Sequence, residues 1–133
     1  MVEVELSRII VTQTSEHQVI WLREKGGTRS FPILIGLFEA LAIHRKLRDE
    51  ETIRPMTHDL LANVITDLDY HLARVIVTAL RENTFYAKLV LADTSRQVEI
   101  DSRPSDAIAL AVRMEAPIFV EEEVLQEVAK EET

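Results

Sequence analysis

Two pairs of β-rich segments, each joined by only a few residues, constrain the fold of this chain more than any other feature. Residues 17–23 and 29–35 flank a turn with two adjacent glycines, which tolerate the positive φ angles of a tight hairpin. Residues 72–80 and 84–92 alternate in polarity, are rich in β-branched residues and have three polar residues between them. Such short connections join antiparallel neighbours. The chain is therefore predicted to contain two β-hairpins.

Segments with the period of a helix interrupt these strands. The apolar spacing predicts helices over residues 37–48, 58–69, 104–116 and 121–130. Further strands are expected at residues 2–12, 97–101 and 118–120. Hairpins mixed with helices, without regular βαβ units, indicate the α+β class. We predict a single compact domain with a mixed, largely antiparallel sheet and about four helices.

The helix expected over residues 58–69 has the clearest local signals. Thr57 is the predicted N-cap, because its hydroxyl can accept from the free N–H groups of the first turn. Met56 and Leu61 occupy the positions of a hydrophobic staple around it. The helix carries one apolar face, formed by Leu60, Leu61, Val64, Ile65 and Leu68.

Composition and charge narrow the class of protein. The 133 residues are 47% hydrophobic and 29% charged, which suits one globular domain, and no apolar run has the ~20 residues of a membrane span. The chain carries −8 overall, but residues 1–120 hold fourteen basic and seventeen acidic side chains, a net −3. This is not the basic surface expected of a strong duplex-DNA binder. We divide the chain into a domain over residues 1–124 and an acidic C-terminal helix end and tail over residues 125–133.

The absence of cysteine excludes disulfides, thiolate zinc sites and a cysteine nucleophile. Acidic residues stand where a signal peptide would carry a basic region. The chain is expected to be cytoplasmic, with no membrane contact. No glycine-rich phosphate loop or dinucleotide fingerprint is present, so no organic cofactor is expected. His17, His44 and His71 do not form the two-histidine helical spacing of a zinc hydrolase.

Two expected helices begin with clusters of polar residues, at residues 54–59 and 101–106. The N-terminus of a helix favours phosphate or another anion, because free N–H groups and the positive end of the dipole lie there. The aspartates of these clusters could instead gather a divalent ion, and His58 could then act as a general base. Helix capping alone explains the same residue types equally well. The clusters are therefore candidates for a site or for simple caps.

The same clusters resemble a known family. Residues 54–61 and 100–111 are similar to the two signature segments of the bifunctional nuclease domain family, and residues 31–36 with Glu39 look like its strand-to-helix joint. The resemblance covers residues 2–124, and the run RPSDAIALA is its most specific part. It implies a compact α+β fold, a homodimer, and the DNase and RNase activity credited to plant members.

The resemblance carries over a set of polar motif positions, to which a metal-assisted phosphodiester mechanism would assign roles. Asp101 and Asp106 would hold a divalent ion, Mg²⁺ or Mn²⁺, while Arg103 would stabilise the charge on the phosphate. Carried over residue by residue, the polar positions of the motifs are Glu39, His58, Asp59, Asp101, Arg103, Ser105 and Asp106.

Two functions remain open at this point. The first is a metal-assisted nuclease that acts on RNA or DNA, for which single strands suit the charge of the chain better than long duplex. The second is a non-catalytic regulatory module, a homodimer whose helix starts bind an anion or a nucleotide. Loss of cleavage with a chelator would separate the two. The sequence does not locate the dimer interface.

Overall fold

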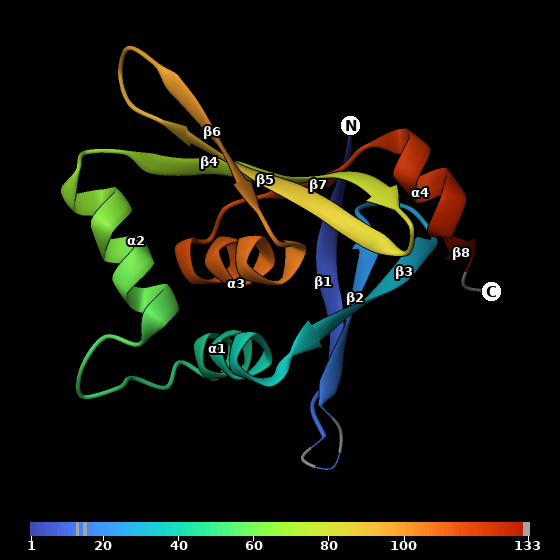
Figure 1. Cartoon of the computed structure of the whole chain (residues 1–133), viewed down its shortest axis with the longest axis horizontal. Coiled ribbons are helices and arrows are strands. Elements are labelled where there is room, and N and C mark those ends of the chain that lie inside the picture. The colour runs from blue at the N-terminus through green and yellow to red at the C-terminus, as the bar shows by residue number, and fades with distance from the viewer. Residues whose placement is uncertain (13, 15, 132–133) are drawn as a thin grey trace.

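A computed structural model describes residues 1–12, 14 and 16–131, and these residues form one sheet of eight strands with four helices (Figure 1). This is the predicted α+β fold. The elements in chain order are β1 (Val2–Ile10), β2 (His17–Glu24), β3 (Arg29–Gly36), α1 (Leu37–Leu47), α2 (Thr57–Asp67), β4 (His71–Arg81), β5 (Thr84–Ala92), β6 (Gln97–Ser102), α3 (Pro104–Met114), β7 (Ile118–Val120), α4 (Glu122–Val128) and β8 (Lys130–Glu131). None of these helices combines the length and apolarity that a membrane crossing requires.

The short strand β7 joins the two predicted hairpins into one sheet. The strand order is β6-β5-β4-β7-β1-β2-β3-β8, and every pair is antiparallel except β4 with β7. Ile118 of β7 pairs with Val75 of β4 on one side and with Val4 of β1 on the other. The three residues of β7 therefore connect the meander β4–β5–β6 to the meander β1–β2–β3. The predicted hairpins β2–β3 and β4–β5 are both confirmed.

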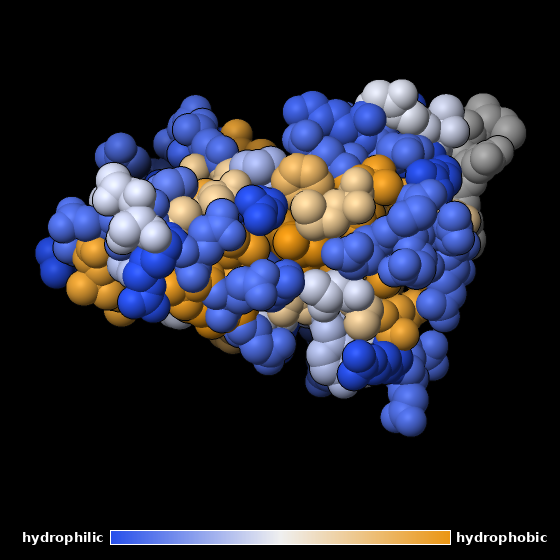
Figure 2. All heavy atoms as spheres, turned by 90° about the horizontal axis from the view of Figure 1, so that it is seen from above, coloured by the Kyte–Doolittle hydropathy of each residue, from blue (hydrophilic) through white to orange (hydrophobic). Residues whose placement is uncertain are grey.

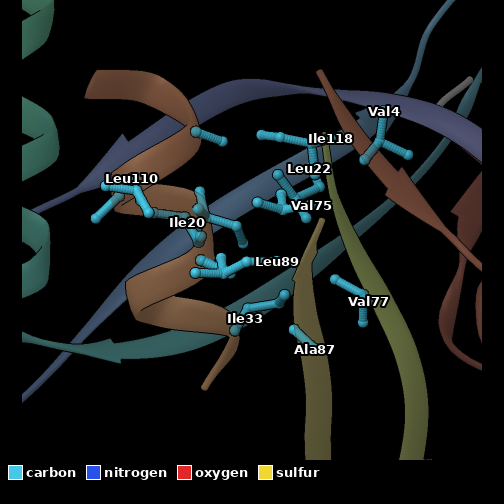
Figure 3. Packing of buried hydrophobic residues seen from close by; sticks show 14 of the residues in the cluster. Val4, Ile20, Leu22, Ile33, Val75, Val77, Ala87, Leu89, Leu110 and Ile118 are labelled. Atoms are coloured by element: carbon cyan, nitrogen blue, oxygen red, sulfur yellow. The ribbon is translucent and has the colours of Figure 1, made fainter. Parts of the chain in front are cut away.

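Helix α3 is the central helix of the core. Pro104 occupies its first turn, where a missing N–H leaves no intrahelical bond unmade. The helix ends at Met114, because Glu115 adopts a left-handed conformation with φ of 56° and Pro117 follows. Its apolar side chains pack against the strands, as Leu110 does beside Ile20 and Leu89 in Figure 3.

The other helices are placed around α3 and the strands. Helices α1 and α2 both contact α3, which lies between α1 and the β4–β5 hairpin, while α2 lies beside α3 and also contacts β4 (Figure 1). Helix α4 lies apart from these three and contacts β3 and β4 (Figure 1). The expected boundaries hold to within about two residues, and the predicted tail runs to residues 132 and 133, which lie outside the described residues.

The predicted N-cap of α2 is wrong by one residue. The first intrahelical bond runs from the N–H of Leu60 to the carbonyl of Met56 at 2.8 Å, so Met56 is the N-cap and Thr57 is the first helical residue. No side chain caps the first turn of α2, and Asp59 instead bonds the cap residue itself. Its Oδ2 accepts from the N–H of Met56 at 3.0 Å, a carboxylate bond that reaches back to the cap residue. With Met56 as the N-cap, Met56 and Leu61 no longer occupy the two positions of a hydrophobic staple.

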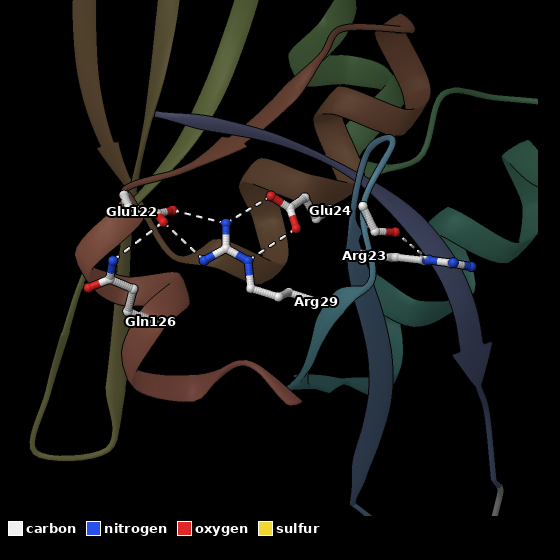
Figure 4. Close-up of polar contacts among 6 residues, drawn as sticks. Arg23, Glu24, Arg29, Glu122 and Gln126 are labelled. Carbon is white, nitrogen blue, oxygen red and sulfur yellow. Dashed lines mark hydrogen bonds and ion pairs between the residues drawn. The ribbon is translucent and has the colours of Figure 1, made fainter. Parts of the chain in front are cut away.

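Arg29 anchors α4 to the β2–β3 hairpin (Figure 4). Its guanidinium donates to both carboxylate oxygens of Glu24, at 3.1 and 2.8 Å, and to both of Glu122, at 3.0 and 3.2 Å. The hydrogen bonds from Arg29 hold the pKa of Glu24 and the pKa of Glu122 below their ordinary values. One cation thus links two carboxylates from distant parts of the chain.

This link predicts a stability difference that depends on pH. The two glutamates have lowered pKa values in the folded chain, so their contribution is complete above the pKa of an unfolded glutamate, about 4.3, and is lost as the pH falls through the folded pKa. We expect Arg29→Gln to lower the melting temperature at pH 7 and to have little effect at pH 3. Thermal melts followed by circular dichroism across this range measure the difference.

Lys25→Gln is the matched control, because Lys25 makes an exposed ion pair with Glu3 at 3.2 Å. Its effect on the melting temperature should be small at every pH. An Arg29→Gln effect of equal size at pH 3 and pH 7 would show that the packing of the Arg29 stem, and not its charge, holds α4.

Candidate functional site

The first turns of α1, α2 and α3 place four of the predicted polar side chains in contact. Arg103 donates to Oδ2 of Asp106 from Nε at 3.0 Å, with Nη2 2.9 Å from the same oxygen. The other oxygen of Asp106, Oδ1, lies 3.0 Å from Nε2 of His58. On the opposite side, Nη2 of Arg103 lies 4.0 Å from Oε2 of Glu39. We call Glu39, Arg103, Asp106 and His58 the polar chain.

Glu39 is the buried end of the polar chain. It stands in the first turn of α1, where its carboxylate is near the positive end of the helix dipole. Its Oε2 accepts from the N–H of Gly36 at 2.9 Å. A Cβ at position 36 would lie 2.7 Å from that same oxygen, which is closer than real Cβ contacts allow. Glycine therefore allows this close approach between the carboxylate and the end of β3, and a larger residue there would require the carboxylate to shift.

His58 is the other end, and its environment defines a tautomer. The carboxylate of Asp106 accepts a hydrogen bond, so the ring nitrogen Nε2 is the donor. In the neutral imidazole the second nitrogen, Nδ1, is then an acceptor. The side chain is only 12% exposed but lines a hollow of about 510 Å³ between α1, α2 and α3, which we call the first hollow. His58 is thus oriented by an acid and placed at a cavity.

Arg103 lies on the opposite side of the polar chain. It is 68% exposed and lines a second hollow of about 610 Å³, together with Glu39 and Ser105. The hydrogen bond with Asp106 raises the pKa of Arg103, so its positive charge is secure at any physiological pH. Ser105 is buried beside it in the first turn of α3. The polar chain therefore separates two hollows, with the imidazole on one and the guanidinium on the other.

Asp59 forms a second contact between α2 and α3. Its Oδ1 accepts from Nε of Arg113 at 2.8 Å. Partial burial works against ionisation of Asp59, but the bonds from Arg113 and from the N–H of Met56 outweigh it, so the pKa of Asp59 lies below its ordinary value. His58 and Asp59 thus fasten the start of α2 to two points along α3. Asp59 joins the neighbourhood of the site but not the polar chain.

Asp101 is a predicted site residue that lines neither hollow and does not join the polar chain. It pairs with Lys88 across β5 and β6, while its neighbour Ile100 pairs with the core residue Leu89. Successive side chains of a strand point to opposite faces of the sheet, so Asp101 faces away from the side on which Leu89 packs. The side chain is exposed. The pleat of β6 thus separates Asp101 from Asp106.

The oxygen atoms present do not form a ready divalent-ion site. Both carboxylate oxygens of Asp106 already contact neighbours, one His58 and the other Arg103. Across residues 1–12, 14 and 16–131, no group of three or more His, Asp or Glu side chains is placed to hold a metal ion. The divalent ion expected at Asp101 and Asp106 stays a prediction.

Basic residues around the first hollow are the part of the site that the sequence reasoning missed. Arg45 and Lys46 from the last turn of α1 line this hollow with Arg113. Arg113 follows Asp106 by seven residues, which is two helical turns, so both fall on one face of α3. That spacing was the available signal. The hollow also carries acidic residues at its rim, namely Asp49, Glu50 and Glu51.

Comparison with known proteins places the chain among relatives of one family. The model of a family described as the bifunctional nuclease domain matches residues 20–133. An uncharacterised protein of Mycobacterium tuberculosis is 42% identical over 125 residues, covering 94% of this chain and 74% of its own length. Bifunctional nuclease 2 of Arabidopsis thaliana is 30% identical over 108 residues, 78% of this chain but 33% of the plant protein. Bifunctional nuclease 1 of Oryza sativa subsp. japonica is 26% identical, and the chain spans 32% of it. The chain therefore belongs to the bifunctional nuclease domain family, and its domain is nuclease-like.

Proposed function

We propose that this chain cleaves phosphodiester bonds in single-stranded RNA or DNA at the His58 end of the polar chain, with His58 as proton acceptor and Arg45 and Lys46, which line the same hollow, as the cations that stabilise the phosphate. The observation that carries the proposal is the contact of the Asp106 carboxylate with His58 at a hollow that basic side chains also line. Asp106 fixes the imidazole of His58 in one tautomer and one orientation, which is what a general base requires.

The chemistry follows from His58 and the cations that line the first hollow with it. A water molecule attacks the phosphorus while Nδ1 of His58 takes one of its protons. The bond from phosphorus to the leaving oxygen breaks, and that oxygen receives a proton from the imidazolium or from solvent. Negative charge grows on the non-bridging oxygens, where Arg45 and Lys46 of the first hollow provide stabilisation. Arg103 lines the second hollow and holds the Asp106 carboxylate in place. Removal of one such electrostatic contact typically costs about 100-fold or more in rate.

The charge distribution favours a flexible substrate. Arg45, Lys46 and Arg113 surround the first hollow, but residues 1–120 carry a net −3, and acidic side chains stand at the rim of this hollow. Long duplex requires an extended basic surface that neutralises many phosphates. A single strand can bend to place one or two phosphates at local cations. The match covers 33% of the length of the plant relative bifunctional nuclease 2. The cleavage proposed here is therefore that of this domain alone.

The second candidate function is a non-catalytic module that binds an anion or a nucleotide. One observation favours it: the charges of Arg103 and Asp106 already satisfy one another at 2.9 Å, as in a structural ion pair. In that case the polar chain fastens three helix starts together, and the ligand occupies a hollow without turnover.

Hydrolysis of labelled single-stranded RNA and DNA, with Mg²⁺, with Mn²⁺ and with chelator, tests the proposal. We expect cleavage that falls at least about 100-fold in Asp106→Asn and is unchanged in the matched variant Asp101→Asn. Chelator sensitivity together with loss of activity in Asp101→Asn would instead support the metal site predicted from the sequence. No cleavage by folded wild-type protein under any condition would overturn the nuclease proposal in favour of the binding module.

A further inference from the structure

Two buried polar side chains line the second hollow with oxygen atoms that no neighbour uses. Ser105 is 7% exposed, and its hydroxyl makes no hydrogen bond with any other described residue. Glu39 is 8% exposed; its Oε2 accepts from the N–H of Gly36 at 2.9 Å, but its Oε1 has no hydrogen-bond partner among the described residues. Neither oxygen is fully enclosed, because the one enclosed side-chain atom without a partner in this part of the chain is Nε of Arg74. Both oxygens therefore open into the hollow, where a ligand can bond them.

Exposed apolar side chains are a weaker signal in this molecule. Hydrophobic atoms reach the surface at several separate places in Figure 2. Helix α2 buries Ala62 and Ile65. It exposes a second apolar stripe, Leu60, Val64 and Leu68, so the apolar face predicted for this helix is split. Such exposure is common in soluble proteins, whereas a buried polar atom without a partner requires an explanation.

A group that only donates stands next to the acceptors of the second hollow. Nη2 of Arg103 lies 4.0 Å from Oε2 of Glu39, which is too far for a hydrogen bond. The guanidinium carries five N–H donors in one plane, and across the described residues only Asp106 accepts from it. Its side chain is 68% exposed, so free donors remain accessible. The hollow thus offers a carboxylate acceptor and a guanidinium donor side by side, with a hydroxyl that can do either.

Apolar side chains form the rest of the wall. Leu34, Phe85 and Pro104 line the second hollow beside the polar groups. Its volume of about 610 Å³ falls in the range of about 300–1,000 Å³ that is typical of small-molecule sites. Proteins that read an unpaired base hold its flat face against aromatic or apolar side chains and bond its edge. The second hollow has both elements.

We propose that the second hollow binds a guanine base by its Watson–Crick edge. Guanine presents two adjacent donors on this edge, N1–H and the exocyclic amino group, with the acceptor O6 next to them. Glu39 accepts from both donors, Arg103 donates to O6, and the Ser105 hydroxyl adds a further bond to the base. Adenine and cytosine place an acceptor beside their single amino group, and uracil has one N–H between two acceptors. Guanine is thus the base whose edge matches a carboxylate next to an arginine.

A phosphate group fits the second hollow less well than a neutral base. Arg103 is the one arginine or lysine among the described residues that line it, and its charge is already paired with Asp106 at 2.9 Å. Glu16 and Glu39 add two carboxylates to the lining, which repel an anion. Basic side chains gather at the first hollow instead. Base binding at the second hollow and cleavage at His58 are therefore separate properties, and either can fail without the other.

Titration of the purified chain with guanosine 5′-monophosphate (GMP), followed by isothermal calorimetry without metal, tests this site. We expect GMP to bind at least about tenfold more tightly than AMP, which carries the same phosphate and ribose. Inosine 5′-monophosphate lacks the exocyclic amino group and should fall between the two. Equal affinity for GMP and AMP would overturn the proposal. Displacement of GMP by an equal concentration of inorganic phosphate would also overturn it, by identifying an anion site.

Two substitutions test whether these side chains hold the base. Glu39→Gln keeps an oxygen for the N–H of Gly36 but sets an NH₂ donor against the donors of guanine, so GMP binding should weaken at least about tenfold. Asp101→Asn is the same chemical change outside both hollows, and this matched control should bind GMP as wild type does. Ser105→Ala removes no hydrogen bond between described residues, so it should keep the wild-type melting temperature while it weakens GMP binding severalfold.

A variant of the first hollow separates this site from the proposed nuclease. His58→Gln should lose cleavage but keep the wild-type ratio of the AMP and GMP dissociation constants, because His58 lines the first hollow and not the second. If Glu39→Gln does not fold, Ser105→Ala decides the matter. Unchanged GMP affinity in Ser105→Ala would place the base elsewhere and overturn the proposal.

Discussion

Replacing His58 with alanine is expected to lower the rate of nucleic-acid cleavage by at least about 100-fold, the typical contribution of a positioned proton acceptor. The reason is the arrangement of the imidazole, which contacts Asp106 through one nitrogen at 3.0 Å while the ring lines the first hollow. Alanine removes the proton acceptor and leaves Asp106 bonded only to Arg103. Initial rates on a labelled single-stranded oligonucleotide, at fixed salt, measure the loss.

The matched variant His58→Gln separates a catalytic role from a structural one. The amide nitrogen of glutamine can donate to Asp106 in place of Nε2, but glutamine cannot take a proton near neutral pH. A structural histidine would therefore be rescued by glutamine, whereas a proton acceptor would not. We expect His58→Gln to melt close to wild type and to cleave as slowly as His58→Ala. Wild-type rates in His58→Gln would remove His58 from the mechanism.

His71→Ala provides the control for histidine substitution in general, since His71 is exposed at the start of β4. Its cleavage rate should equal that of wild type. If His58→Ala and His71→Ala both cleave at the wild-type rate, the activity belongs to a contaminating nuclease or to another part of the surface.

The fold was predictable where the signals were local. The glycine-containing turn between β2 and β3 and the three polar residues between β4 and β5 set two hairpins, and both formed. The central place of β7 was not predictable, because three apolar residues do not say which strands they pair with. Its partners β1 and β4 lie far away in the sequence and are brought together only by tertiary packing.

The site was predictable as a set of residues but not as a geometry. The helix starts supplied Glu39, His58, Arg103 and Asp106, and these four do meet. Asp101 stands in the same motif, but its side chain lies on the face of β6 opposite to the core face that Ile100 shares with Leu89. Sequence distance alone could not reveal this. Likewise, the apolar residues of α2 indicate a helix, but they do not say which of its two stripes the rest of the chain covers.

The largest expected effect on stability is that of Leu110→Ala. Leu110 is 0% exposed in the middle of α3, and Figure 3 shows it beside Ile20. A buried leucine truncated to alanine loses about 2–5 kcal/mol of unfolding free energy, because apolar contacts are lost and a cavity remains. Domains of this size are stable by only about 5–15 kcal/mol.

Urea denaturation at one fixed protein concentration measures this loss, with Leu47→Ala as control because Leu47 is 55% exposed on α1. The control should change the unfolding free energy by less than about 0.5 kcal/mol. The helix that Leu110 fixes also carries Asp106 and Arg113, so the two contacts that fasten α2 depend on its position. We therefore expect Leu110→Ala to lower the cleavage rate as well, even at temperatures where the variant is fully folded. A Leu110→Ala variant as stable as the Leu47→Ala control would show that α3 is not the centre of the core. Unchanged cleavage in a destabilised variant would show that the polar chain holds its geometry without the packing of this helix.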